Sequence, residues 1–187
     1  MQIFLINVND FTEDKFNLCL SLMDEKRRLY LNSLKHTKNK LLSVAAEWLV
    51  KENVAKILNK PIEEVVILRE EKGKPYIEGN PLYISISHSG DFAAIAIESK
   101  PVGIDVEVIK PVHKKLKDRI CTDSDLKYVL SLDNETDENL KTLEIWTAKE
   151  AYFKKIGTGI TNFKSISYKD IKATHKIEGS ILITTVT

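Results

Sequence analysis

Cysteine is nearly absent from this chain, which holds only Cys19 and Cys121 among its 187 residues. The two thiols form no CxxC pair and no metal-ligand spacing, and two cysteines cannot build a disulfide framework. No stretch approaches the roughly 18 consecutive apolar residues of a transmembrane helix. Residues 1–8 form a short apolar run without a basic leader or a small-residue cleavage site, so we predict a strand there and not a signal peptide. These absences favour a reducing, cytoplasmic location.

An excess of either charge is also lacking. The formal net charge is +1, which supports neither a general nucleic-acid role nor a membrane role, so any charged partner must be recognised by local patches. No internal repeat, low-complexity linker or GxxxxGK[ST] phosphate loop is evident. What is present is an ordinary globular composition, 43% hydrophobic and 29% charged, in a chain short enough for one domain or two closely packed halves.

The spacing of apolar residues predicts an α+β fold. Helical spacing is clearest over residues 38–58 and 140–156, the second ending at Gly157, and a shorter helix is expected over 13–22. The polar residues 87–91, Ser-His-Ser-Gly-Asp, are expected to form a hairpin turn. Strands are expected at 2–8, 65–68, 82–86, 92–97, 102–109, 165–168 and 181–186.

Two acidic residues interrupt an apolar strand in the segment VGIDVEVI, residues 102–109. Because side chains alternate along a strand, Asp105 and Glu107 share one face, while the apolar residues between them face the core. Carboxylates held side by side repel each other unless a cation or a proton lies between them. An exposed pair on an edge strand is the simplest interpretation, but two hard oxygen ligands at this spacing also suit Mg²⁺ that binds phosphate.

A third carboxylate lies on the helix predicted for residues 140–156. Trp146, Glu150 and Lys154 are spaced four residues apart and share one helix face. They could form a surface ion pair beside a core tryptophan, which would contribute only about 0.2–0.5 kcal/mol. Alternatively, Glu150 completes the metal site and Lys154 contacts charge that develops during a reaction.

Two turn-forming segments and a basic cluster are candidate anion sites. Residues 85–90, SISHSG, would offer backbone N–H groups, hydroxyls and an imidazole to a phosphate, or form an ordinary polar turn. Residues 73–75, GKP, combine a permissive glycine, the charge of Lys74 and a stiff proline. The basic residues between positions 26 and 40 could form an anion site, but they are also typical of a solvated helix face.

Taken in order, these segments resemble the 4′-phosphopantetheinyl transferases, in particular the larger monomeric, surfactin-synthetase-activating type that serves nonribosomal peptide, polyketide and fatty-acid synthases. The resemblance implies a pseudo-dimer of two similar α+β halves, residues 1–101 and 102–187, with one active site between them. It rests on GKPYI (73–77), YISISHSGDFAAIAI (83–97), VGIDVEVI (102–109) and WTAKEAYFKKIGTGI (146–160), with weaker similarity at EKRRLY (25–30).

The resemblance also implies a reaction. Coenzyme A would donate its 4′-phosphopantetheine arm to a serine of an apo acyl or peptidyl carrier protein, and 3′,5′-ADP would leave. In the family pattern, Asp105, Glu107 and Glu150 hold Mg²⁺ at the coenzyme A pyrophosphate. Glu150 is also the general base, acting directly or through water, and Lys154 stabilises or protonates the leaving phosphate.

Further residues are assigned to coenzyme A by the same resemblance. Lys74 is expected along the nucleotide portion, and Ser87 and His88 at the phosphates. The arginine that the family usually carries before its long N-terminal helix is missing here, so Lys26 and Lys40 are expected to replace it at the 3′-phosphate. At the other end, residues 177–187 leave little room for the C-terminal hairpin of the family, so either a trimmed second half or a truncated chain is expected.

The expected partner surface follows the carboxylate strand directly. Carrier proteins of this class are acidic, so a basic segment here would either steer the carrier to the site or be a solvated helix face. A monomer is expected, with no nucleic-acid and no membrane partner. The basic residues of this segment are Lys110, Lys114, Lys115, Lys117 and Arg119.

Two other functions remain open from the sequence. The carboxylates could serve another Mg²⁺-dependent nucleotide or pyrophosphate hydrolase, although no phosphate loop supports it. The chain could also be a catalytically silent module that binds coenzyme A or a carrier protein. The complete set of Asp105, Glu107, Glu150 and Lys154 argues for an enzyme.

Overall fold

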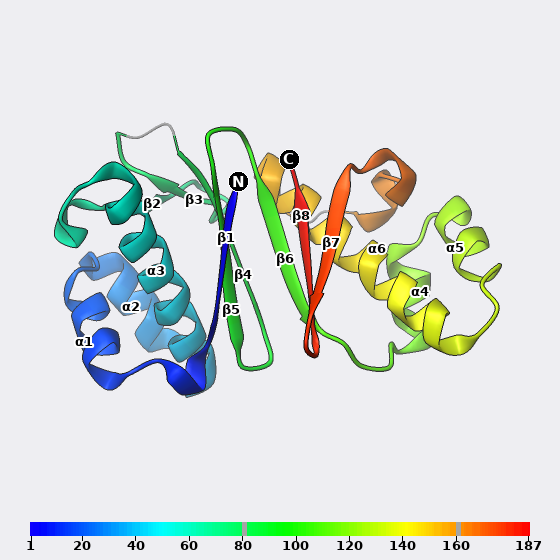
Figure 1. Cartoon of the computed structure of the whole chain (residues 1–187), viewed down its shortest axis with the longest axis horizontal. Helices are drawn as coiled ribbons and strands as arrows, with labels where there is room; N and C mark the ends of the chain where they lie inside the picture. Colours follow the sequence, from blue (N-terminus) through cyan, green and yellow to red (C-terminus); the bar gives the residue numbers. More distant parts are fainter. Residues whose placement is uncertain (80–81, 160–161) are drawn as a thin grey trace.

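Residues 1–79, 82–159 and 162–187 are described by the computed structural model of the chain. Two three-stranded antiparallel sheets lie side by side in the middle of the molecule, with helices outside both (Figure 1). A separate two-stranded sheet pairs β2 (Ile67–Arg69) with β3 (Pro75–Ile77). The first large sheet has the order β1 (Gln2–Asn7), β5 (Phe92–Glu98), β4 (Tyr83–Ser89), and the second has the order β6 (Gly103–Val108), β8 (Ile181–Val186), β7 (Ala173–Glu178).

Each large sheet carries one long helix and two shorter ones, so the predicted α+β class is confirmed. In Figure 1 the helices of the first half lie on the left and those of the second half on the right. Among the described residues, no helix is both long enough and apolar enough to cross a membrane. The helices are α1 (Glu13–Ser21), α2 (Glu25–Ser33), α3 (Thr37–Leu58), α4 (Lys114–Ile120), α5 (Asp123–Val129) and α6 (Glu135–Ile156).

Capping residues define the ends of the long helices. The Asn134 side chain accepts a hydrogen bond from the backbone N–H of Asp137, so α6 begins five residues earlier than its apolar spacing predicts. Gly157 ends α6 in the left-handed conformation, with φ of 71°, as predicted. Asn59 ends α3 in the same way, with φ of 50°.

The chain follows the same path twice. Each half runs through a first strand, a long helix and a hairpin, and in each half the first strand pairs antiparallel with the last. β1 and β6 are both six residues long, and their registers begin at Gln2↔Ile97 and Gly103↔Val186. The predicted pseudo-dimer of two similar halves is therefore confirmed.

The two long helices also share a sequence pattern, so the expectation that the chain has no internal repeat is wrong. Both helices have 22 residues, and Trp-x-x-Lys-Glu-x-x-x-Lys occupies the same positions in each, at residues 48–56 and 146–154. The left-handed residues Asn59 and Gly157 follow at the same distance. Only four of the nine positions agree, which is why the pattern becomes apparent only when the helices are aligned by their structure.

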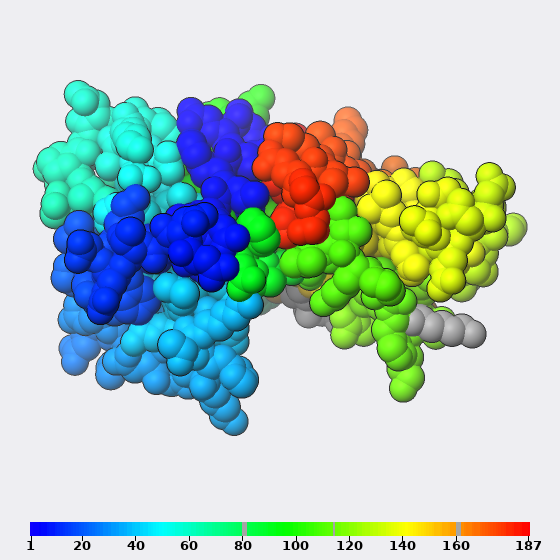
Figure 2. All heavy atoms as spheres, turned by 60° about the horizontal axis from the view of Figure 1, so that its bottom comes forward, coloured from blue at the N-terminus to red at the C-terminus, as the bar shows by residue number. Residues whose placement is uncertain are grey.

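Small residues let the second half pack closely on the first. Ala94 and Ala96 of β5 are fully buried in a cluster with apolar residues of β6 and β8. Gly103 has no room for a side chain, because a Cβ there would lie 1.8 Å from the carbonyl oxygen of Ala151 in α6. β6 is thus held between the first sheet and α6. Figure 2 shows the resulting two lobes, with the surface indented between them.

The last two strands differ from the sequence prediction. Residues 165–168 form no strand: Ser165 ends one short 3₁₀ turn and Tyr168 begins the next, while the strand is β7. Although residues 177–187 were expected to leave little room for a C-terminal hairpin, β7 pairs with β8 over six residues. β7 is polar and mostly exposed, so it lacks the expected alternation, whereas every residue of β8 is buried.

The turn predicted for residues 87–91 is also too long. β4 continues through Ser89, and only Gly90 and Asp91 form the turn. The serines of this segment remain in a strand because the backbone of β4 pairs with β5 through Ser89, and their hydroxyls find hydrogen-bond partners on β6.

Candidate active site

A cavity of about 540 Å³ lies between the two halves, and both halves contribute to its lining. All the residues predicted for the site contribute except Lys26 and Lys40. The charged and aromatic lining residues include Arg27, Tyr30, Arg69, Lys74 and His88 from the first half, and Asp105, Glu107, Trp146, Glu150, Phe153 and Lys154 from the second.

Asp105 is the most deeply buried of the three carboxylates, with 5% of the residue exposed. Its Oδ1 atom accepts hydrogen bonds from Lys154 Nζ at 2.6 Å and from Ser87 Oγ at 2.7 Å. Its Oδ2 atom is buried and has no hydrogen-bond partner within the described part of the chain. A buried carboxylate oxygen without a partner is costly, so this atom is suited to receive a cation.

Glu107 lies two residues further along the same face of β6. Its Oε2 atom accepts a hydrogen bond from Ser89 Oγ at 2.6 Å, and its Oε1 atom accepts one from Trp146 Nε1 at 3.3 Å. The strand periodicity predicted this shared face correctly, and the pair is not an exposed edge-strand feature.

Glu150 lies opposite this pair, on α6. Burial and the negative charges of Asp105 and Glu107 raise the pKa of the Glu150 carboxyl from 4.5 to about 7, although the charges of Lys154 and Arg119 act in the other direction. A carboxyl with this pKa is partly protonated at neutral pH, because burial and the two neighbouring carboxylates outweigh the nearby positive charge.

The donor set fits a magnesium ion. The described residues contain no ready-made cage of three or more His, Cys, Asp or Glu ligands. Mg²⁺ does not need one, because it typically takes one or two carboxylates and completes its shell with waters and substrate phosphates. The unpartnered oxygen of Asp105 and the raised pKa of Glu150 both indicate a place for an additional cation.

Positive and neutral donors face the carboxylates. Lys154 Nζ contacts both Asp105 and Ser87 Oγ, the latter at 2.8 Å. Lys74 Nζ donates to the carbonyl oxygen of Lys155 at 2.5 Å, so the loop of the first half is tied to the end of α6. Partial burial and the charge of Lys154 lower the pKa of the His88 imidazole, although its side chain still reaches solvent. His88 is therefore a neutral donor at neutral pH.

Two arginines that the sequence analysis missed line the first-half side of the cavity. Arg27 Nε and Arg69 Nη2 both donate to the Oε1 atom of Glu47, at 2.5 and 2.6 Å. The Glu47 side chain is only 4% exposed. A signal was available, because a glutamate on the apolar face of a predicted helix is almost never buried without a cationic partner.

Lys26 and Lys40 lie outside the cavity lining. The Lys26 side chain is exposed on α2, and Lys40 Nζ donates to Asn32 Oδ1 at 2.9 Å. On an α-helix, residues next to each other point in different directions, so Arg27 can face the cavity while Lys26 faces solvent.

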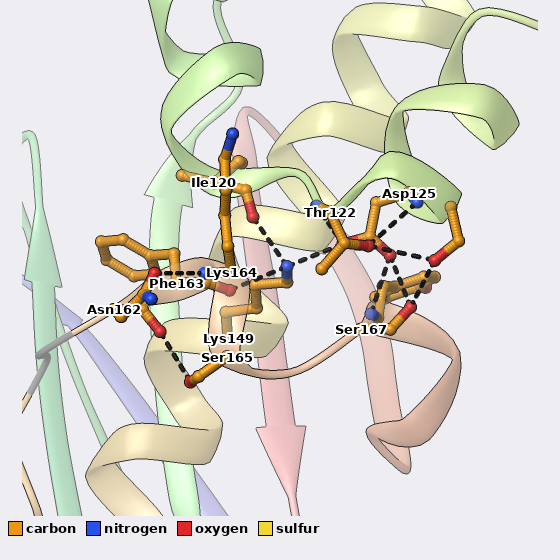
Figure 3. A network of polar contacts seen from close by, with 11 residues as sticks. Ile120, Thr122, Asp125, Lys149, Asn162, Phe163, Lys164, Ser165 and Ser167 are labelled. Atoms are coloured by element: carbon orange, nitrogen blue, oxygen red, sulfur yellow. Dashed lines mark hydrogen bonds and ion pairs between the residues drawn. The ribbon is translucent and has the colours of Figure 1, made fainter.

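A buried lysine fastens the surrounding segments to α6 (Figure 3). Lys149 is fully buried, and its Nζ donates to Asp125 Oδ2 and to the carbonyl oxygens of Ile120 and Phe163, at 2.7, 2.7 and 3.0 Å. Burial favours the neutral form of Asp125, but hydrogen bonds from Lys149, Thr122 and the backbone of Tyr168 outweigh it and lower the pKa. The network holds Phe163 against Trp146, with ring centroids 4.9 Å apart.

The basic segment after β6 is only partly available to a partner. Lys110, Lys115 and Arg119 are exposed, whereas Lys117 forms an ion pair with Glu138 at 2.5 Å. The side chain of Lys114 and residue Ile160 of the helix motif lie outside the described residues.

Two family models match the chain in succession. The model described as 4′-phosphopantetheinyl transferase, N-terminal, matches residues 10–100, and that of the 4′-phosphopantetheinyl transferase superfamily matches residues 101–185. The chain therefore belongs to the 4′-phosphopantetheinyl transferase superfamily, and within it to the larger type.

Individual relatives agree with this assignment. The 4′-phosphopantetheinyl transferase gsp of Aneurinibacillus migulanus is 27% identical over 81% of this chain, and the transferase psf-1 of Bacillus pumilus is 31% identical over 64% of it. The matches span 63% and 51% of those relatives, so the chain covers less than two thirds of their length. The solved holo-[acyl-carrier-protein] synthase of Thermotoga maritima is 20% identical, with a TM-score of 0.39, over 46% of this chain and 61% of that chain.

Proposed function

We propose that this protein transfers the 4′-phosphopantetheine arm of coenzyme A to a serine of an apo acyl or peptidyl carrier protein, releasing 3′,5′-ADP, with Mg²⁺ as cofactor. The observation that carries the proposal is the cavity between the halves, which brings Asp105, Glu107, Glu150 and Lys154 opposite the basic side chains of the first half. Both halves, residues 1–101 and 102–187, then act as one catalytic unit. Membership of the superfamily supports the same reaction.

The nucleotide portion of coenzyme A would bind on the first-half side. Arg27, Arg69 and Lys74 present positive charge there, and guanidinium groups bind phosphate oxygens in pairs of parallel hydrogen bonds. We therefore assign the 3′-phosphate to the arginines and not to Lys26 or Lys40. His88 can donate one hydrogen bond to a phosphate without adding charge, whereas the Ser87 hydroxyl already donates to Asp105.

Mg²⁺ would be held on the second-half side by Asp105, Glu107 and Glu150. When bound, it would neutralise charge on the coenzyme A pyrophosphate and on the transferring phosphoryl group. The Oδ2 atom of Asp105 is the best-prepared ligand, because it is buried and unpartnered among the described residues.

The residues of the chain would then promote attack by the carrier serine on the β-phosphorus of coenzyme A. Glu150 would accept the serine proton, directly or through one water molecule. Lys154 would stabilise or protonate the 5′-phosphate of 3′,5′-ADP as the bond to the β-phosphorus breaks. The cavity walls would align the serine oxygen with the leaving oxygen, which is the main requirement of phosphoryl transfer.

The carrier protein would approach along α4. Lys115 and Arg119 on α4, and Lys110 before it, are exposed and could attract an acidic partner, while Lys117 is occupied by Glu138. We further propose a monomer that acts without nucleic-acid or membrane partners. The two cysteines are buried and unpaired, which is compatible with a cytoplasmic location.

Intact-mass measurement of an apo carrier protein tests the proposal. After incubation with this chain, coenzyme A and Mg²⁺, the carrier should gain one phosphopantetheine on serine, and the gain should disappear in EDTA. Binding of coenzyme A without any mass gain on several carriers would instead indicate a silent binding module. Hydrolysis of the pyrophosphate without transfer would indicate a nucleotide hydrolase.

A further inference from the structure

Three serines alternate along β4 and face the edge of β6. Ser85, Ser87 and Ser89 point to the same side because side chains alternate along a strand. Their hydroxyl oxygens accept hydrogen bonds from the backbone N–H groups of Ile104, Val106 and Val108, at 3.0, 3.2 and 3.3 Å. The separation of 19 residues is constant, so β4 and β6 run side by side in the same direction.

This row of contacts, which we call the serine ladder, joins the two sheets without backbone pairing. β6 is the edge strand of its own sheet, and an edge strand leaves backbone N–H groups that need partners. The serine hydroxyls supply them. Residues 87–89 form a strand because they pair with β5, and the ladder gives their hydroxyls partners although their composition is typical of a turn.

Two of the three serines do more than accept. Ser87 Oγ donates to Asp105 Oδ1 at 2.7 Å, and Ser89 Oγ donates to Glu107 Oε2 at 2.6 Å. No carboxylate accepts a hydrogen bond from Ser85 within the described part of the chain. The hydroxyls of Ser87 and Ser89 therefore each accept a hydrogen bond from the β6 backbone and donate one to a carboxylate, so each holds its carboxylate in place.

We propose that Ser87 and Ser89 are positioning residues that orient the carboxylates of the cation site. This inference rests on the proposed function, because it assigns Asp105 and Glu107 to a metal ion. By occupying Oδ1 of Asp105, Ser87 and Lys154 direct the unpartnered Oδ2 to the ion. Ser89 and the Trp146 indole each donate to one oxygen of Glu107, which fixes the orientation of that carboxylate. Outer hydrogen bonds of this kind commonly change metal affinity by about 10- to 100-fold.

Ser85 provides a matched control inside the same ladder. It is buried like Ser87, and it accepts a backbone N–H in the same way, but it orients no carboxylate. Ser85→Ala and Ser87→Ala should both lower the thermal midpoint, because each leaves one β6 N–H without its hydroxyl, and Ser87→Ala also loses the contacts of Ser87 with Asp105 and Lys154. Only Ser87→Ala should change the affinity for a divalent ion.

The experiment is a Mn²⁺ titration of the full chain followed by EPR, with saturating coenzyme A and no carrier protein. We expect Ser87→Ala and Ser89→Ala to raise the Mn²⁺ dissociation constant about 10-fold, and Ser85→Ala to change it less than about 2-fold. Ser89→Thr keeps the hydroxyl on a half-buried side chain and should restore the affinity. If Ser87→Ala does not fold, the comparison of Ser89→Ala with Ser89→Thr and Ser85→Ala decides.

Two outcomes would overturn the inference, and they differ in meaning. If Ser85→Ala weakens Mn²⁺ as much as the other two, or if none of the three does, the ladder is only a structural joint and the proposed function stands. If the wild-type chain with coenzyme A binds no Mn²⁺, the metal assignment fails together with the inference.

Discussion

The pattern Trp-x-x-Lys-Glu-x-x-x-Lys occurs once in each half, but only the second copy faces the cavity between the halves. Glu150 and Lys154 lie there with Asp105, whereas their counterparts Glu52 and Lys56 form a loose ion pair of 3.7 Å on the outer side of the first half. Lys56 is 68% exposed in that pair. An identical helix motif therefore does not define a site by itself.

The strand opposite each helix explains the difference. In the aligned registers, Asp105 and Glu107 of β6 correspond to Phe4 and Ile6 of β1. Those two apolar residues pack into the core beneath α3. This face of β1 is therefore part of the core of the first half, whereas the same face of β6 carries two carboxylates into the cavity. The cavity then combines carboxylates from one half with arginines and lysines from the other.

Removing a carboxylate of the second half should have the largest effect on activity. We expect Glu107→Gln and Glu150→Gln each to reduce phosphopantetheine transfer about 10³-fold or more, because positioning and charge stabilisation supply most of the catalysis in phosphoryl transfer. The matched variant Glu52→Gln, at the equivalent position of α3, should leave the rate unchanged. Intact-mass kinetics measures all three. Substantial turnover by Glu150→Gln would show that Glu150 is no more important for transfer than its counterpart Glu52.

The buried lysines of the two helices should differ in their effect on stability. Lys149→Met leaves Asp125 buried without its cation and should cost about 3–5 kcal/mol of unfolding free energy. Lys51→Met, at the same helix position, removes only a hydrogen bond to the Val65 carbonyl and should cost about 1–3 kcal/mol. Urea denaturation measures both. The double variant Lys149→Met/Asp125→Leu should regain stability, and failure to do so would contradict the assigned role of the ion pair.

The raised pKa of Glu150 predicts a pH dependence of the free energy of unfolding. The folded pKa of about 7 lies above the unfolded value of 4.5, so the native state holds an extra proton between these values. Raising the pH through this window therefore destabilises the fold. Because the side chain is partly exposed, we expect only about 1–2 kcal/mol.

Urea denaturation in EDTA at pH 5 and pH 8 tests this sign. Glu150→Gln should be more stable than the wild type at pH 8 and about equal at pH 5. A stability difference between wild type and Glu150→Gln that is the same at both pH values would contradict the coupling to Asp105 and Glu107.

Charge reversal on the carrier surface should have the smallest effect. Lys110→Glu with Lys115→Glu should raise the KM for an acidic carrier about 3- to 10-fold at low salt, with kcat unchanged, and the effect should shrink at high salt. Lys56→Glu with Lys60→Glu changes the net charge equally in the other half. If both double variants behave alike, net charge and not a docking surface would be responsible.

Local periodicity was enough to predict which second-half side chains of the candidate site share a face. The period of two placed Asp105 and Glu107 on one face of a strand, and the spacing of four placed Glu150 and Lys154 on one face of a helix. Both relations lie within a single element. The sequence also predicted the long helices and the central strands, because their apolar patterns are strong.

Features that depend on contacts between distant segments were not predictable in this way. Arg27 and Arg69 reach the cavity because both bind the buried Glu47. The three residues lie on α2, β2 and α3, which are separate segments of the chain. The serines of β4 remain in a strand because its backbone pairs with β5 and their hydroxyls bind β6. Residues 173–178 form β7 because they pair with β8, and their own mostly polar sequence does not predict a strand.

The division of labour between the halves is tested most directly by the coenzyme A dissociation constant, measured calorimetrically in EDTA and in Mg²⁺. Arg27→Gln should weaken binding about 10-fold in EDTA and keep the gain in affinity that Mg²⁺ gives the wild type. Glu107→Gln should keep the affinity in EDTA and lose that gain, and Lys26→Gln should resemble the wild type. If Arg27→Gln loses the Mg²⁺ gain, or Glu107→Gln loses the affinity in EDTA, the two halves do not divide the work as described.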